Sequence, residues 1–102
     1  MPYREVEPDV VKARLANGED VFLLDVREPS EVAEWAYPIG VHIPLGQLGD
    51  RLGELPKDTT IVVACRSGGR SATAANALSE AGWTAENLTG GALAWEATEP
   101  EG

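Results

Sequence analysis

The chain holds a single cysteine, Cys65, and the residues after it are of types that can activate a thiol. An apolar run ends at this cysteine and continues into the polar turn Arg66-Ser67-Gly68-Gly69-Arg70-Ser71. Adjacent glycines let a backbone curl around a small group, and a curled loop that enters a helix points several N–H groups inward. Inward N–H groups, the helix dipole and nearby arginines stabilise a thiolate and lower the thiol pKa from about 8.5. We therefore predict that Cys65 is largely a thiolate at neutral pH and acts as a nucleophile.

The alternative is that Cys65 is an inert packing residue at a strand end, followed by an ordinary turn. The flanking arginines and the helix start favour the reactive interpretation.

The spacing between Cys65 and the second arginine also bears on the type of reaction. Four residues separate Cys65 from Arg70, whereas cysteine phosphatases use a wider Cys-x5-Arg loop, and here the sixth residue after Cys65 is Ser71. A narrower loop favours a single sulfur atom over a tetrahedral phosphate.

The elements that must position this loop follow from the apolar pattern. Residues 21–26 and 60–65 form nearly continuous apolar runs, which indicate central strands of a parallel sheet. Helices are predicted over residues 8–16, 29–35, 48–55, 71–81 and 92–97, with a further edge or inner strand over 84–88. In the helix after Cys65, the face formed by Ala72, Ala75, Leu78 and Ala81 is expected to be buried. The alternation predicts an α/β domain with a small, mostly parallel central sheet flanked by helices on both faces. This domain is expected to span residues 1–98, with a short flexible acidic tail at 99–102.

Composition narrows the function. Seventeen acidic residues against eight basic ones give a net charge of −9 in 102 residues, which argues against nucleic acid and anionic membranes as partners. It is compatible with a basic protein partner. One cysteine excludes an intramolecular disulfide, and with one histidine it leaves no zinc site of ordinary composition, so we expect no metal and no cofactor. The chain has no apolar run of about 18 residues and does not begin like a signal peptide, so we expect a reducing, cytoplasmic location.

Other polar and aromatic residues have structural interpretations. We expect Asp25 to tie down loop backbone and Arg27 to pair with Glu28 or Glu31. His42 is interpreted as a hydrogen-bonded structural histidine. The three tryptophans are expected in the core, with the mouth of a pocket as the alternative place for Trp35.

Four segments in order resemble the signatures of the rhodanese family. They are Leu23-Leu24-Asp25-Val26-Arg27-Glu28-Pro29-Ser30-Glu31, Tyr37-Pro38-Ile39-Gly40-Val41-His42-Ile43-Pro44-Leu45, Cys65-Arg66-Ser67-Gly68-Gly69-Arg70-Ser71 and Asn87-Leu88-Thr89-Gly90-Gly91-Ala92-Leu93-Ala94-Trp95. Together they cover about residues 5 to 96. The second segment departs from the family, because Trp35-Ala36-Tyr37 replaces the usual Gly-His-Ile and Ile39-Gly40 the usual Gly-Ala. The departure bears on acceptor preference, and the loop after Cys65 is intact.

The resemblance implies a rhodanese-like three-layer fold and a thiosulfate:cyanide or thiol sulfurtransferase that carries sulfane sulfur as a persulfide on Cys65. The loop residues Arg66, Ser67, Gly68, Gly69, Arg70 and Ser71 would bind substrate: the N–H groups would hold the sulfur, and Arg66, alone or with Arg70, would bind the anionic donor. Arg70 could instead orient the loop.

The acceptor would be cyanide, a thiol or a sulfur-accepting protein, and this chain would be a monomer or a weak dimer. The alternative is a sulfur-relay or regulatory interaction module with little thiosulfate turnover. A phosphatase or arsenate reductase is disfavoured by the loop length.

Overall fold

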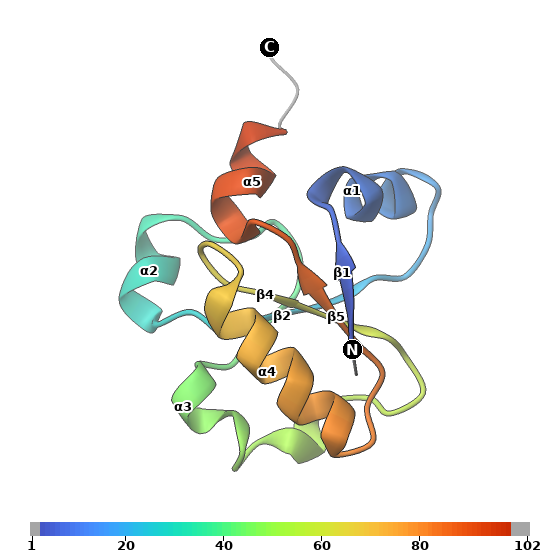
Figure 1. Ribbon diagram of the computed structural model, residues 1–102. Helices are drawn as coiled ribbons and strands as arrows, with labels where there is room; N and C mark the ends of the chain where they lie inside the picture. Colours follow the sequence, from blue (N-terminus) through green and yellow to red (C-terminus); the bar gives the residue numbers. More distant parts are fainter. Residues whose placement is uncertain (1–2, 99–102) are drawn as a thin grey trace.

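The computed structural model describes residues 3–98, which form a parallel sheet of five strands in the order β1-β5-β4-β2-β3, with helices on both faces (Figure 1). The elements in chain order are β1 Arg4–Val6, α1 Pro8–Ala16, β2 Phe22–Asp25, α2 Pro29–Glu34, β3 Val41–His42, α3 Leu45–Leu48, the 3-10 helix η1 Leu52–Glu54, β4 Ile61–Ala64, α4 Gly69–Glu80, β5 Ala85–Leu88 and α5 Gly91–Ala97. The predicted three-layer α/β architecture is confirmed.

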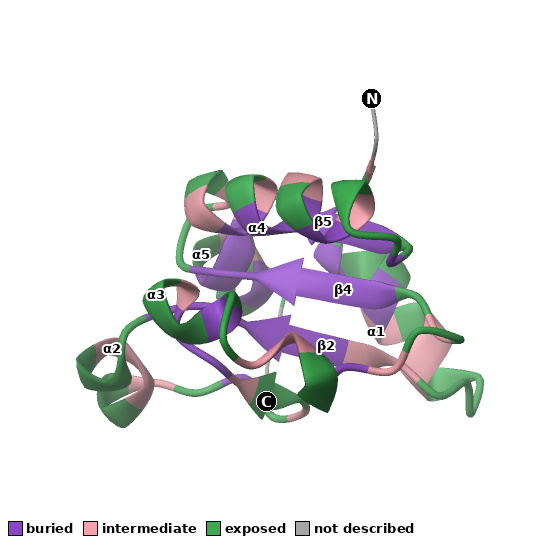
Figure 2. Cartoon of the chain, turned by 90° about the horizontal axis from the view of Figure 1, so that it is seen from below, coloured by how far each residue is buried: buried purple, intermediate pink, exposed green. Residues whose placement is uncertain are grey.

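Strand β4 lies at the centre of the sheet, and its position explains the unbroken apolar run. It pairs with β2 on one side and β5 on the other, and all four of its residues are buried (Figure 2). Ile61 and Val63 pack in one core cluster with Leu78 of α4. Val62 and Ala64 pack in the other, which includes Val11 of α1 and Trp95 of α5. Both faces of β4 are covered, so no position along it favours a polar side chain.

The structure corrects several predicted boundaries. Of the helix predicted over 48–55, only Leu48 lies in α3 and residues 52–54 form the 3-10 helix η1, with residues 49–51 between them. Glycine at positions 49 and 53 disfavours one continuous helix there. The edge strands β1 and β3 were not predicted, since strands of three and two residues carry too little apolar pattern. Strand β5 is an inner strand of the sheet.

Helix α4 also differs from the prediction, because it begins at Gly69 and buries a shifted face. Its buried residues are Ser71, Ala74, Ala75 and Leu78, whereas Ala72 is half-buried and Ala81 is exposed. Ser71 is tolerated on this buried face because its hydroxyl group has hydrogen-bonding partners in the core.

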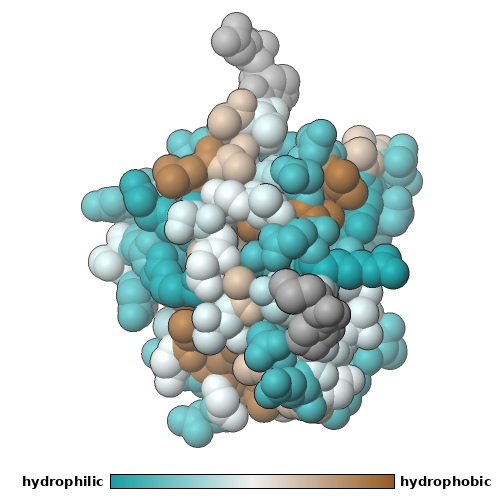
Figure 3. Space-filling view, in the orientation of Figure 1, coloured by the Kyte–Doolittle hydropathy of each residue, from teal (hydrophilic) through white to brown (hydrophobic). Residues whose placement is uncertain are grey.

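Between α3 and α4 the surface has an apolar groove of about 160 Å³, seen as a brown patch in Figure 3, lined by Leu45, Leu48, Leu52, Ala74, Ala77 and Leu78 among others.

Two other expectations concern the limits of the domain and membranes. The predicted tail, 99–102, lies outside the described residues, and the 1–98 boundary stays a prediction. Over residues 3–98, no helix combines the length and the apolar character that a bilayer crossing requires.

The start of α5 packs directly on the segment that follows β4. The backbone N–H of Ala92 donates to the carbonyl of Cys65 at 2.9 Å, and that of Leu93 donates to the carbonyl of Arg66 at 3.1 Å. This approach depends on Gly91, whose φ is +57°. A Cβ atom there would lie 2.6 Å from the carbonyl atoms of Cys65 and Arg66. A glycine is therefore required at this position.

We predict that Gly91→Ala lowers the free energy of unfolding by about 2–4 kcal/mol, because it adds both a left-handed backbone penalty and a backbone clash. Chemical denaturation measures the change. Gly46→Ala is the matched control, because Gly46 lies in α3 with nothing within 4 Å of its Cβ position and no positive φ. This control should be neutral or slightly stabilising. Equal stability of the two variants would contradict the proposed contact.

Candidate active site

The sulfur of Cys65 lies directly beyond β4, at the carboxyl edge of the sheet, where α/β proteins bind their ligands. The residue is 1% exposed. The backbone N–H of Gly68 donates to Sγ at 3.0 Å, and the hydroxyl oxygen of Ser71 lies 3.3 Å from Sγ. Gly68 has a φ of +106°, a left-handed conformation that lets the loop turn back over the sulfur. The structure thus places the loop around the Cys65 sulfur, and the role of Cys65 as a nucleophile stays a prediction.

The carbonyl groups at the start of the loop are bonded outward, away from its interior. The Cys65 carbonyl accepts hydrogen bonds from the N–H of Ala92 and, at 2.7 Å, from the hydroxyl of Tyr37, and the Arg66 carbonyl accepts from Leu93. In a trans peptide the N–H points opposite to the C=O. The N–H groups of the next residues along the chain are therefore turned toward the interior of the loop. Burial raises the pKa of Tyr37, so its hydroxyl remains a donor.

Two opposing effects act on the pKa of the Cys65 thiol. Burial is the largest and raises the pKa, because it removes water from the thiolate. Hydrogen bonds from the Ser71 hydroxyl and from the backbone N–H groups of Ser71, Gly68 and Ser67 lower it, and together they outweigh burial. The pKa of Cys65 therefore lies below the ordinary value for a thiol. A lowered pKa increases the thiolate fraction at a given pH, and the thiolate is the nucleophilic form of cysteine.

Asn87 of β5 is a residue of the site that sequence reasoning missed. Its Oδ1 accepts a hydrogen bond from the Ser71 hydroxyl at 2.5 Å, and its Nδ2 donates to the Gly68 carbonyl at 3.2 Å. Nδ2 also donates to both carboxylate oxygens of Glu5, which lies on the neighbouring strand β1. The signal for this role was a polar residue within a short strand, since buried polar side chains usually serve a hydrogen-bonding network.

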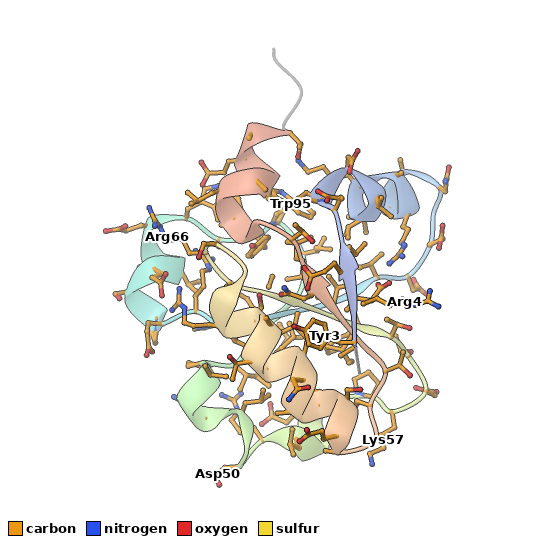
Figure 4. The ribbon with its side chains drawn as sticks, in the orientation of Figure 1. Tyr3, Arg4, Asp50, Lys57, Arg66 and Trp95 are labelled. Atoms are coloured by element: carbon orange, nitrogen blue, oxygen red, sulfur yellow. The ribbon has the colours of Figure 1, made fainter. Side chains whose placement is uncertain are left out.

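The two arginines of the loop differ in their surroundings. Arg70 forms an ion pair with Glu31 of α2, with Nη2 2.8 Å from the carboxylate, and this pair lowers the pKa of Glu31 to about 2. Arg66 is exposed and, over residues 3–98, forms no ion pair. It lies on the side where α2 and α5 approach the loop (Figure 4). The charge of Arg66 is therefore available to an anion, and that of Arg70 is largely compensated.

Arg27 does not pair with Glu28 or Glu31 through their carboxylates, which corrects the prediction. Both Asp25 and Arg27 are buried, and the guanidinium contacts the Asp25 carboxylate at 2.8–3.1 Å. Asp25 also accepts the backbone N–H of Arg27, as expected of a residue that ties down loop backbone. Asp25 is two residues from Arg27, at the buried end of β2, whereas the Glu31 carboxylate is held by Arg70. The buried Arg27 guanidinium therefore pairs with the buried carboxylate beside it, because a buried charge needs a partner.

Tyr37 and Trp35 lie near the loop, whereas His42 lies beside the residues that follow β2. His42 contacts the Arg27 carbonyl through Nε2 at 2.7 Å, which fits a structural role. Trp35 stacks edge-on against Tyr37, with ring centroids 4.9 Å apart, and borders a surface cleft of about 160 Å³. The cleft is lined by Arg27, Glu31, Glu34, Trp35, Arg66, Ala92, Leu93 and Glu96. Trp35 is thus at the mouth of a pocket, whereas Trp83 and Trp95 lie in the core. Over residues 3–98, no three or more His, Cys, Asp or Glu side chains are grouped to hold a metal ion.

Comparisons with known proteins agree with this geometry. A family model described as a rhodanese-like domain matches residues 7–98. The putative sulfurtransferase YtwF of Bacillus subtilis is 38% identical over 102 residues, covering 99% of this chain and 99% of the relative. A sulfurtransferase of Allochromatium vinosum is 39% identical over 92 residues, covering 89% of this chain and 86% of the relative. Among solved structures, a rhodanese-like domain protein from Staphylococcus aureus is 30% identical with a TM-score of 0.87, and the match covers 90% of each chain. The chain therefore belongs to the rhodanese-like family of sulfurtransferases.

Proposed function

We propose that this protein moves a sulfane sulfur atom from a small anionic donor such as thiosulfate to a thiol or cyanide, and that it carries the sulfur as a persulfide on Cys65. The observation that supports this most directly is the set of donors on the sulfur, the Gly68 N–H at 3.0 Å and the Ser71 hydroxyl at 3.3 Å. These groups stabilise negative charge on sulfur without any metal or organic cofactor.

In the first half-reaction the Cys65 thiolate attacks the outer sulfur of thiosulfate. A new S–S bond forms on Cys65, the S–S bond of the donor breaks, and its electron pair leaves with sulfite. The negative charge then lies on the outer sulfur of the persulfide. The N–H groups of residues 66–70 would hold that charge. The outward-bonded carbonyls of Cys65 and Arg66 support this for the N–H groups of Arg66 and Ser67, and the hydrogen bond to Sγ supports it for Gly68.

In the second half-reaction an acceptor attacks the outer sulfur. Cyanide leaves as thiocyanate, or a thiolate leaves as a persulfide, and the Cys65 thiolate is restored as the leaving group. A lowered pKa of Cys65 favours this step, because a more acidic thiol is the better leaving group. A second cysteine is not needed for the cycle.

Arg66 is the residue that we assign to the anionic part of the donor. It is exposed, borders the cleft and keeps its charge uncompensated within residues 3–98. The net charge of −9 acts mainly at longer range, and it is screened beyond about 8 Å at physiological salt. Distant carboxylates therefore matter little at the loop. Within the cleft Glu31 is held by Arg70, so the carboxylates with which Arg66 competes are those of Glu34 and Glu96. We assign Arg70 to orientation of the loop, because Glu31 already holds it.

The acceptor in the cell can be a protein. Leu93 is 50% exposed and borders the same cleft as Arg66, so it offers an apolar contact to a partner that brings a thiol to the loop. We also place the reaction in the cytoplasm, a reducing compartment in which a lone thiolate remains reactive. If Cys65 accepts sulfur but turns over thiosulfate only slowly, the protein acts as a sulfur relay rather than a thiosulfate enzyme.

We predict that incubation with thiosulfate adds the mass of one sulfur atom to the protein, localised to Cys65. Intact-protein and peptide mass spectrometry measure the addition, with dithiothreitol used to show that it is reversible. The Cys65→Ala variant should gain no sulfur. An equal gain in that variant, or none in the unmodified protein with thiosulfate or with a persulfide donor, would refute the proposed carrier.

We predict that Arg66→Ala raises the thiosulfate KM by about tenfold or more, because a hydrogen bond to a charged group contributes about 1.5–3 kcal/mol. The kcat should change much less. Arg51→Ala is the matched control, since it removes the same charge from the exposed Arg51–Glu54 pair, away from the loop. Steady-state kinetics at fixed ionic strength compare the two. Equal KM values for the two variants would remove Arg66 from the donor site.

A further inference from the structure

The hydroxyl group of Ser71 lies between two acceptors that compete for its single proton. Its Oγ is 2.5 Å from Oδ1 of Asn87 and 3.3 Å from Sγ of Cys65, and all three residues are at least 95% buried. A serine hydroxyl has one O–H to donate. In a site closed to water, the proton that one acceptor gains is therefore lost to the other.

The partners of Asn87 fix which way its amide points. Nδ2 lies 3.1 Å from each carboxylate oxygen of Glu5 and 3.2 Å from the carbonyl of Gly68, and these groups are acceptors. The opposite orientation would place Oδ1 against three oxygen atoms. Oδ1 therefore faces Ser71, and because it can only accept, the proton in that short contact comes from the Ser71 hydroxyl.

We propose that Asn87, oriented by Glu5, is a positioning residue that holds the Ser71 proton away from the Cys65 sulfur until that sulfur carries a negative charge. In the thiol form the short bond to Asn87 keeps the proton. In the thiolate form a charge-assisted bond to sulfur is about twice as strong as a neutral one, so the hydroxyl turns toward Sγ. The proton stays covalently bound to Oγ throughout. This inference rests on the proposed role of Cys65 as the sulfur carrier.

The competition between Asn87 and Sγ for the Ser71 proton would set the thiol pKa at a compromise between the two half-reactions. Because Asn87 draws the Ser71 proton away, Ser71 stabilises the thiolate less than it otherwise could. The intrinsic nucleophilicity of a thiolate falls as its pKa falls, so a thiolate that is less stabilised attacks the donor faster once it is ionised. When the persulfide forms, charge leaves Sγ for the outer sulfur, and the hydroxyl can return to Asn87.

Other charged or ionisable groups near Cys65 are unchanged by a substitution at Asn87. They are Arg66 and Arg70 of the loop, Asp25 and Arg27 at and after the end of β2, and Tyr37 after α2. Glu5 of β1 is the exception, because it loses the Asn87 amide, but it is exposed and keeps the hydrogen bond from the Thr89 hydroxyl. Gly68 also keeps an anchor, because its carbonyl accepts the backbone N–H of Ala72 at 3.2 Å. Loss of Asn87 should therefore free the Ser71 hydroxyl and leave the N–H of Gly68 on the sulfur.

The test is the pH dependence of iodoacetamide alkylation of Cys65 in four proteins: the unmodified chain, Asn87→Leu, Ser71→Ala and the double variant. With Asn87→Leu, Ser71 loses the acceptor that competes with Sγ, so the thiol pKa should fall by about one unit. At a pH at which Cys65 is fully ionised in both proteins, Asn87→Leu should attack thiosulfate about threefold more slowly than the unmodified chain. In the Ser71→Ala background, Asn87→Leu should shift the pKa little.

Asn76→Leu is the matched control. It makes the same chemical change on α4, where the Asn76 side chain donates to Glu80 at 3.5 Å, and it should leave the alkylation profile unchanged. If Asn87→Leu fails to fold, Asn87→Ala is measured in the same way and is expected to shift the pKa in the same direction. A raised or unchanged pKa, or a fall of equal size without Ser71, would overturn the inference. Failure of the unmodified protein to load sulfur would instead refute the proposed function, because alkylation does not depend on sulfur transfer.

Discussion

The site depends on the hydrogen bonds that hold the carbonyl groups of Cys65 and Arg66 away from the interior of the loop. The first turn of α5 donates its N–H groups to both, and the Tyr37 hydroxyl donates to the first. A peptide whose carbonyl is held outward must turn its N–H the other way. Without those donors, buried carbonyls would compete for the interior of the loop and would repel a thiolate. The glycine at position 91 is what allows α5 to approach closely enough.

A second constraint reaches the sulfur from the edge of the sheet. Glu5 on β1 orients Asn87 on β5, which contacts both the turn of the loop and Ser71 at the start of α4. The network crosses from an exposed carboxylate to a buried thiol, so its polar groups have partners inside an otherwise apolar core. It thereby links two strands of the sheet to the glycine-containing loop.

Charge around the loop is divided between two arginines that the sequence presents as equivalent. Arg70 lies on the first turn of α4, within reach of α2, and Glu31 compensates its charge. Arg66 is exposed at the cleft and forms no ion pair within residues 3–98, so its charge remains available. Because the Glu31 carboxylate is paired with Arg70, Arg27 pairs with Asp25 instead. The Arg27 guanidinium also packs over the rings of Trp35 and Tyr37, at 5.4 and 5.3 Å from their centroids. Position in the fold therefore decides which partner each cation meets.

The sequence alone determined the parts of the protein that local patterns encode. Continuous apolar runs at 21–26 and 60–65 determined that β2 and β4 would be buried on both faces, and the glycines after Cys65 determined a tight loop at the end of β4. The order of four signatures determined the family. Only the tertiary structure decided which polar groups meet. Asn87 and Glu5 are 82 residues apart, Tyr37 and Cys65 are 28 apart, and Arg70 and Glu31 are 39 apart. Backbone conformation depends mainly on neighbouring residues, whereas a buried hydrogen bond between distant segments depends on how whole elements pack, so the chain order gives no direct sign of it.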